Sequence, residues 1–297
     1  MSVRHQLDRV WPLWHEWVQI TRFNKPVGSY LLLWPTLWAL WIAAEGLPSW
    51  QNLIIFTLGV FLMRSAGCVI NDYADRHIDR HVKRTQDRPL TQGRLTEKQA
   101  LRGFVVLCLL AFGLVLLTNS LTIWLSFGGV FLAALYPFMK RHTHLPQVFL
   151  GMAFSWSIPM AFAAEANQLT TICWLLFIAK VCWTVGYDTI YAMVDRDDDL
   201  RIGVKSTAIL FGDLDVTIIA ILFAMAHICM LSVGLQLELH WSYLIGWLAG
   251  LGYLVWQIWA IRSRERMVCF REFRQAHWYG VIMWLALIIS YAIKSSV

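Results

Sequence analysis

Long apolar runs follow one another through most of this chain, and they limit its possible folds more than any other feature. Nine runs can be marked, each of about 20 residues, the length at which an α-helix crosses the hydrocarbon core of a bilayer. Only helices and closed barrels satisfy all backbone polar groups in that core. The sequence therefore predicts an all-α integral membrane protein, a bundle of about nine transmembrane helices. The runs are 27–46, 51–70, 99–117, 121–139, 146–164, 169–187, 215–234, 241–260 and 277–293.

The composition agrees with a membrane location. Hydrophobic residues make up 58% of the chain and charged residues 15%, whereas a soluble domain is roughly half apolar and a quarter charged. Pro35 and Pro159 fall inside predicted helices, where neighbouring helices can satisfy the backbone groups that a proline frees. No linker rich in Gly or Ser divides the chain, so residues 27–297 are expected to form a single membrane domain.

Residues 1–26 differ from the rest because they carry charges and lack a long apolar run. Trp14, Trp17, Val18 and Thr21 recur at helical spacing, with charged residues elsewhere on the helical wheel. This pattern favours an interfacial helix on the cytoplasmic surface of the membrane rather than a signal peptide. Residues 1–26 are therefore expected to form a cytoplasmic interfacial segment.

Basic residues are confined to one side of the predicted bundle. The N-terminal segment and every second connection hold nearly all of the 25 Lys and Arg residues, and the C-terminal tail holds only Lys294. This positive-inside distribution predicts a multi-pass protein of the cell inner membrane, with the N-terminus in the cytoplasm and the C-terminus outside. The net charge of +6 then reflects topology and contact with the lipid bilayer rather than nucleic-acid binding. No obligate protein partner is indicated.

Two acidic segments follow predicted spans on the cytoplasmic side. In the first, Asn71, Asp75 and Asp79 recur every four residues, so a helix that continued through them would carry all three on one face. The second segment has the same spacing at Tyr187, Tyr191, Asp195 and Asp199. Two such stripes predict a polar site that faces the cytoplasm. The alternative is that both segments are solvated loops beside their spans.

A shift of 116 residues aligns the two acidic segments, which suggests two helical halves that deliver carboxylates to one site. The matches are Arg64 with Lys180, Asp72 with Asp188 and Asp79 with Asp195. Arg64 and Lys180 lie about 12 Å deeper along their helices than the matched aspartates. Charges at that depth are expected to face the interior of the bundle, and the sequence leaves their roles open.

The acidic stripes call for a compensating cation, because like charges four residues apart destabilise a helix. Carboxylate oxygens, completed by water and substrate phosphate, are the ligands that Mg²⁺ requires. Zinc is disfavoured because paired His or Cys ligands are missing, and calcium because no EF-hand loop occurs. Clustered basic residues nearby suit the phosphates of a metal-bridged polyphosphate. The preferred diphosphate contacts are Lys83, Arg84 and Lys205.

The two acidic segments resemble those of a known family. The patterns Asn71-Asp72-x-x-Asp75-x-x-x-Asp79 and Asp195-x-x-x-Asp199 are similar to the two aspartate-rich motifs of the UbiA intramembrane prenyltransferases. Three further stretches resemble those family members whose acceptor is 4-hydroxybenzoate: 31–40, 136–147 and 186–207. One departure is Asn24, where the family usually has Asp.

The resemblance implies an enzyme that moves a polyprenyl group from polyprenyl diphosphate to 4-hydroxybenzoate in ubiquinone biosynthesis. It also implies nine transmembrane helices and a lateral route for the lipid tail. One magnesium ion would be bound by Asn71, Asp75 and Asp79, and a second by Asp195 and Asp199. These two aspartates and Arg141, which matches an arginine proposed to hold the aromatic acid, form the expected catalytic set. The expected substrate-binding residues are Arg22, Lys83, Arg84, Arg88, Arg141, Tyr191 and Lys205.

The sequence leaves two other functions open. The first is prenyl transfer to a different acceptor of the same family, such as homogentisate, a naphthoate or haem. The second is cation transport along the carboxylates. A transporter would more often have its carboxylates near the midplane of the membrane, on broken helices, whereas these lie at the cytoplasmic edge beside basic residues.

Overall fold

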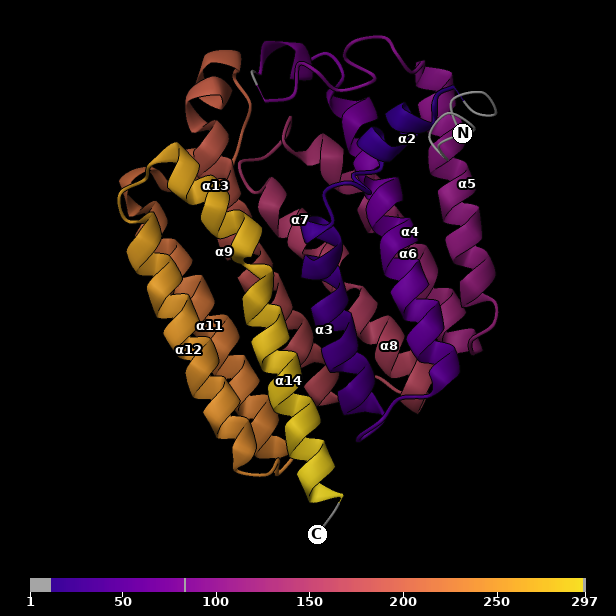
Figure 1. Ribbon diagram of the computed structural model, residues 1–297, viewed down its shortest axis with the longest axis vertical. Coiled ribbons are helices and arrows are strands. Elements are labelled where there is room, and N and C mark those ends of the chain that lie inside the picture. The colour runs from indigo at the N-terminus through magenta and orange to yellow at the C-terminus, as the bar shows by residue number, and fades with distance from the viewer. Residues whose placement is uncertain (1–11, 83, 296–297) are drawn as a thin grey trace, which may run out of the picture.

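The computed structural model of the protein describes residues 12–82 and 84–295, which form helices and connections without any strand (Figure 1). The elements in chain order are α2 (Trp14–Ile20), α3 (Val27–Ala43), α4 (Trp50–Asp75), η1 (Asp79–His81), α5 (Glu97–Val115), α6 (Ser120–Met139), α7 (Pro146–Ser155), α8 (Ser157–Ala166), α9 (Thr171–Ile202), α10 (Thr207–Phe211), η2 (Gly212–Leu214), α11 (Asp215–Gln236), α12 (Ser242–Ile261), α13 (Arg266–Gln275) and α14 (His277–Lys294).

The prediction of a multi-pass, all-α membrane protein is confirmed. Eight helical segments of the described chain are long and apolar enough to cross a membrane. They comprise α4, α5, α6, α7 with α8, α9, α10 with α11, α12, and α13 with α14. Helix α3 is also apolar and has 17 residues, which is at the short end of the range that spans a bilayer. A count of nine spans depends on this helix and stays a prediction.

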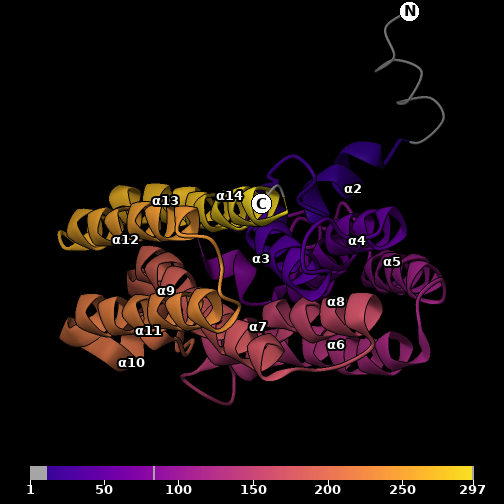
Figure 2. The same cartoon turned by 90° about the horizontal axis from the view of Figure 1, so that it is seen from below.

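The bundle has two sides, which pack together mainly through α3 against α8, α13 against α9 and α12 against α11. Figure 2 shows α2 to α5 and α12 to α14 toward one side of the molecule and α6 to α11 toward the other. Helix α9 packs against α7, α11 and α13, while α14 packs against α12 and α3. Helix α9 is therefore the central element of the bundle. In Figure 1, α2 lies near one end of the long axis of the molecule and the last turn of α14 lies at the other end.

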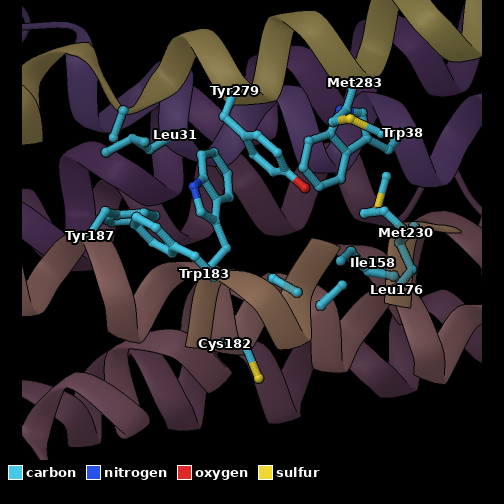
Figure 3. Close-up of a cluster of buried hydrophobic side chains, with 14 of the residues drawn as sticks. Leu31, Trp38, Ile158, Leu176, Cys182, Trp183, Tyr187, Met230, Tyr279 and Met283 are labelled. Atoms are coloured by element: carbon cyan, nitrogen blue, oxygen red, sulfur yellow. The ribbon is translucent and has the colours of Figure 1, made fainter. Parts of the chain in front are cut away.

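Aromatic side chains join the central helices. The indole of Trp38 in α3 lies 5.8 Å from that of Trp183 in α9, and Trp183 lies 5.2 Å from Tyr279 in α14, measured between ring centroids (Figure 3). Trp38 also donates a hydrogen bond of 2.9 Å from its indole nitrogen to the Gly280 carbonyl. All three aromatic residues are almost fully buried. Aromatic burial of this extent contributes strongly to packing, so these contacts fix α3, α9 and α14 relative to one another.

A small second core joins α2 to the connection between α4 and α5. Ile20, Leu90 and Leu95 are buried together, and Trp17 packs on Gly103 at the start of α5. A side chain at Gly103 would overlap the Trp17 ring, because an added Cβ would lie 2.3 Å from it. The predicted N-terminal helix is therefore present over α2. Residues 1–11 of that segment lie outside the described residues, and its position at a membrane surface remains a prediction.

Candidate active site

The two acidic segments meet at one polar cavity of about 260 Å³. The last turns of α4 and the loop after it form one wall, and the second half of α9 forms the facing wall. Both predicted stripes therefore contribute to a shared site, as the alignment of the two halves suggested. The polar residues that α4, η1 and α9 contribute are Asn71, Asp72, Asp75, Asp79, Tyr187, Asp188, Tyr191, Asp195 and Asp199.

The first acidic segment departs from the predicted continuous helix. Helix α4 ends at Asp75, and Asp79 begins the separate short helix η1. The Thr85 hydroxyl donates to the Asp79 carbonyl at 3.1 Å, and Arg88 donates to the Asp79 carboxylate at 2.6 Å. These contacts with the loop hold Asp79 at the cavity, although α4 does not continue to this residue. The shared helical face thus extends only over Asn71 and Asp75.

The second acidic segment follows the prediction. Tyr187, Tyr191, Asp195 and Asp199 line the cavity from a helix that continues to Ile202. The helix ends at Gly203, whose φ of +72° is a left-handed conformation that favours glycine. Its N–H donates to the Asp199 carbonyl.

Basic side chains contact the cavity carboxylates directly. Arg84 donates two hydrogen bonds to Asp195, at 2.6 and 3.1 Å. Its guanidinium also lies 4.8 Å from the centre of the Tyr191 ring. Lys140 pairs with Asp75. A bidentate arginine–carboxylate pair is among the stronger polar contacts in proteins, so Arg84 joins the loop after α4 to α9 across the site.

Arg88 holds the other end of the loop. It lies 2.6 Å from the Asp79 carboxylate and 2.9 Å from that of Asp72. Burial raises the pKa of Asp79 to about 6, against the opposing effect of Arg88, and the neighbouring carboxylates of Asp75 and Asp72 add to the rise. The Asp79 carboxyl is therefore a position where a metal ion would compete with a proton near neutral pH.

Most of the predicted substrate-binding residues also line this cavity. Arg22 does so while pairing with Asp72 at 2.8 Å, and Lys205 lines the cavity beside α9. Arg84, Arg88 and Tyr191 complete the set that the structure brings together. Lys83 lies outside the described residues.

Arg141 lies elsewhere. Its side chain is exposed and does not line the cavity, and its guanidinium donates to the Ala74 carbonyl in the last turn of α4. In this position, Arg141 supports the end of α4, the helix that carries Asp75, and does not reach the cavity.

Arg64 lines the cavity but was not among the predicted site residues. Its Nε is buried without a hydrogen-bond partner among the described residues, and its guanidinium lies against Gly28. A Cβ at Gly28 would lie 2.3 Å from the Arg64 Nε, so any larger residue at position 28 would displace the guanidinium from this position. The signal in the sequence was the depth of Arg64 in its span, which indicated an inward-facing charge without indicating its function. Lys140 was likewise missed, because its sequence context is that of an ordinary end of a span.

A second cavity of about 150 Å³ adjoins the polar one. It runs between α4, α5, α6 and α8, and its lining is almost entirely apolar. Arg64, Tyr136 and Phe154 line both cavities. A ligand with a charged head and an apolar tail could therefore occupy both at once.

The residues at the cavity fit a magnesium ion by their chemistry. The donors are carboxylate and amide oxygens, as Mg²⁺ prefers, and Asp75 Oδ1 is buried without a hydrogen-bond partner. Within residues 12–82 and 84–295, no three His, Cys, Asp or Glu side chains converge as a ready metal cage. Magnesium usually takes one or two carboxylates and completes its shell with water and substrate phosphate.

Comparison with solved structures identifies the fold. A UbiA homolog from Aeropyrum pernix K1 matches 88% of this chain and 97% of its own, with a TM-score of 0.77 and 22% identity. A UbiA homolog from Archaeoglobus fulgidus, bound to GPP and Mg²⁺, matches 92% of this chain and 99% of its own, with a TM-score of 0.68 and 15% identity.

Comparison of sequences identifies the family. The 4-hydroxybenzoate octaprenyltransferase of Pseudomonas syringae pv. syringae (strain B728a) is 56% identical over 294 residues, or 99% of each chain. That of Marinobacter nauticus (strain ATCC 700491 / DSM 11845 / VT8) is 57% identical over 93% of this chain and 95% of its own. The model of the UbiA prenyltransferase family matches residues 32–288. The chain therefore belongs to the UbiA prenyltransferase family.

Proposed function

We propose that this protein transfers a polyprenyl group from polyprenyl diphosphate to 4-hydroxybenzoate in ubiquinone biosynthesis. The new bond forms at the ring carbon ortho to the hydroxyl and meta to the carboxylate. The main support for this proposal is the pair of adjoining cavities, one charged and one apolar, which share Arg64, Tyr136 and Phe154. Their chemistry matches a diphosphate head joined to an isoprenoid tail. The names of the relatives support the choice of acceptor.

The acidic and basic residues bind the head of the donor. Magnesium ions, when bound, neutralise the charge of the departing diphosphate. The proposed ligands are Asn71, Asp75 and Asp79 for one ion and Asp195 and Asp199 for the other. In support, all five line one cavity and offer only oxygen donors. Direct charge-assisted bonds to the phosphates come from four basic residues that line the same cavity, Arg22, Arg84, Arg88 and Lys205. Lys83, which lies outside the described residues, is proposed as a fifth contact.

The apolar surroundings complete the reaction. Tyr136, Phe154 and Tyr187 line the cavity beside the carboxylates, so they exclude water and offer aromatic faces to an allylic cation as the C–O bond breaks. The apolar cavity receives the isoprene units nearest the diphosphate. The allylic carbon then bonds to the acceptor ring. The ring proton leaves to a nearby carboxylate or to the released diphosphate.

The proposal includes a location. Residues 27–297 form one domain in the cell inner membrane, residues 1–26 lie at its cytoplasmic face, and the C-terminus lies outside. The one-sided distribution of Lys and Arg supports this orientation. A reporter that is active only outside the cytoplasm should give signal when fused after Val297. Signal from a fusion in the loop after α4 instead would reverse the orientation.

The test of the reaction uses purified protein in detergent with labelled 4-hydroxybenzoate, a polyprenyl diphosphate and Mg²⁺. Prenylated acid should form, and chelation of the metal should stop its formation. Homogentisate and a naphthoate serve as alternative acceptors in parallel. Turnover with one of these alone would assign a different acceptor. If no acceptor is prenylated and the protein instead carries cations across vesicle membranes, transport is the function.

Two arginines are rivals for the carboxylate of the acceptor. Arg141 has the family resemblance, whereas Arg64 lines the cavity. A charge-assisted bond contributes about 1.5–3 kcal/mol, which corresponds to roughly 10- to 150-fold in kcat/KM. Replacing the anchor by Ala should raise the KM for 4-hydroxybenzoate by about that factor and leave the KM for the prenyl diphosphate nearly unchanged.

The two Ala variants are measured side by side, each with its Lys counterpart. Lys should restore the function of the anchor only in part, because its point charge orients a carboxylate less well than a planar guanidinium. An effect of Arg64→Ala alone would move the acid to the deeper position. If Arg141→Ala raises only the KM for the diphosphate, Arg141 belongs to the phosphate site.

A further inference from the structure

Lys180 is a fully buried lysine in α9, and none of the roles above uses it. An ionisable side chain inside a membrane bundle is costly to bury and is usually retained for a specific partner. Lys180 Nζ donates a hydrogen bond of 2.9 Å to the Leu31 carbonyl of α3 and one of 3.2 Å to the Tyr187 hydroxyl. The bond to a main-chain carbonyl in the middle of another helix is the unusual one.

The Leu31 carbonyl needs such a donor because of Pro35. In an α-helix the carbonyl of residue i accepts from the N–H of residue i+4, and for Leu31 that residue is Pro35, which has no N–H. Leu31 is almost fully buried, and an unpaired backbone carbonyl in an apolar interior is destabilising. Lys180 supplies from α9 the hydrogen bond that α3 cannot supply itself.

Aromatic rings surround the Lys180 amine. The distances from Nζ to the ring centroids are 4.4 Å for Trp183, 5.0 Å for Tyr187 and 5.9 Å for Phe154. These rings enclose the amine. Figure 3 shows Leu31 of α3 facing Trp183 and Tyr187 of α9. The amine is thus held at the junction of the two helices.

This junction forms part of the wall of the polar cavity. Leu31 and Tyr187 both line that cavity. Gly28, one helical turn before Leu31, lines it too and packs against the guanidinium of Arg64. A shift of α3 relative to α9 would therefore move the surface on which Arg64 rests.

We propose that Lys180 is a positioning residue that replaces the backbone hydrogen bond removed by Pro35. It ties the first half of α3 to α9, and through Leu31 and Gly28 it holds the cavity wall beside Arg64. Lys180 does not touch substrate in this role. The inference rests on the proposed function only where turnover is measured, since the bridge itself is a property of the folded protein.

A double-mutant cycle tests the bridge. Lys180→Met leaves the Leu31 carbonyl unpaired, so the Tm should fall by roughly 3–10 °C. We expect kcat/KM for prenyl transfer to fall about tenfold, because a small misplacement of a site can cost up to about 100-fold. Pro35→Ala introduces an N–H for Leu31. In the Pro35→Ala background, Lys180→Met should therefore lose less than half as much in both measurements.

Pro159 provides a control, because it lies in the first turn of α8, where a proline removes no hydrogen bond within the helix, and the hydrogen bonds of Lys180 go to Leu31 and Tyr187. Pro159→Ala should not reduce the effect of Lys180→Met. If Lys180→Met lowers the Tm and kcat/KM equally in all three backgrounds, Lys180 acts through its volume or charge and the proposal is overturned.

The experiment can still be interpreted in two further cases. If Lys180→Met does not accumulate, recovery of folded protein on adding Pro35→Ala supports the bridge, and equal failure of both variants refutes it. If the wild-type protein prenylates no acceptor, the proposed function fails while the cycle in Tm still decides the role of Lys180.

Discussion

The two acidic walls of the cavity are built differently, although their sequences have the same spacing. In α9 the acidic residues lie within one helix of 32 residues, which continues past Asp199. In the other wall, α4 ends at Asp75 and a loop carries Asp79. One wall therefore depends on helical register, and the other depends on side-chain contacts within a loop.

Ion pairs made by two arginines hold the loop wall in its shape. Arg88 connects Asp79 with Asp72, and Arg84 reaches across the cavity to Asp195. Loop backbone is usually more variable than the helices that it connects, and here partly buried ion pairs hold it in place of a helical hydrogen-bond ladder. The backbone of the α9 wall should therefore keep its course when a side chain is replaced but not when a residue is inserted, and the backbone of the loop wall should behave in the opposite way.

The largest expected effect is loss of one carboxylate from either wall. Asp195→Ala and Asp79→Ala should each lower kcat by at least about 100- to 1000-fold, the cost of losing one preorganised electrostatic contact to developing charge. Each wall offers a control: Asp197 in α9 and Asp87 in the loop are exposed and do not line the cavity. Asp197→Ala and Asp87→Ala should remain within about threefold of wild type. Near-normal activity of either cavity variant would remove that wall from the metal site.

Insertions should separate the walls most clearly. One Ala between Asp197 and Asp198 rotates Asp199 by about 100° relative to Asp195, so activity should fall by at least about 100-fold. One Ala between Gln92 and Gly93 lengthens the loop beyond its cavity residues, and loops tolerate such additions well. Activity should then stay within about threefold. Equal losses from both insertions, measured at matched levels of folded protein, would show that the loop is as constrained in length as the helix.

The same contrast explains what the sequence could predict. The apolar runs predicted the membrane helices, and the period of four predicted the shared face of α9 because the helix continues there. The period failed after Asp75, because the contacts of Asp79 with Thr85 and Arg88 decide the local backbone. These contacts join residues only six and nine positions apart in the chain, but they depend on how the loop folds back on itself, which a four-residue period does not encode.

The deeper residues were predictable in direction but not in partner. The burial depth of Arg64 and Lys180 indicated that both face inward, as they do. The bond from Lys180 to the Leu31 carbonyl depends on how α3 and α9 pack, which spacing along the chain does not reveal. For Arg141 the family resemblance implied a role in holding the aromatic acid, which stays a prediction, and the structure has its side chain exposed against the end of α4.

A smaller effect is expected from the loop arginines. Arg88→Ala leaves Asp79 without an ion pair among the described residues, whereas Arg84→Ala leaves Asp195 within 3.8 Å of Arg266. Arg88→Ala should therefore lower the Tm more than Arg84→Ala does, by roughly 2–6 °C. Both should raise the KM for the prenyl diphosphate about tenfold. An Arg84→Ala variant that is less stable than Arg88→Ala would contradict the view that Arg88 is the main support of the loop.

The smallest effect concerns the outer side of the loop, where α2 covers it. Arg94 donates to the Asp87 carbonyl at 2.6 Å and to Gln19 at 3.3 Å, and it pairs with Glu16 at 3.4 Å. Because Arg94 is largely exposed, its pairing should contribute less than about 1 kcal/mol. Arg94→Ala should therefore leave the Tm within about 2–4 °C and turnover within about twofold of wild type. Added salt should weaken this pair further, so the difference from wild type should shrink at high ionic strength. A tenfold loss of turnover in Arg94→Ala would instead mean that α2, and not the pair Arg84 and Arg88, holds the loop over the cavity.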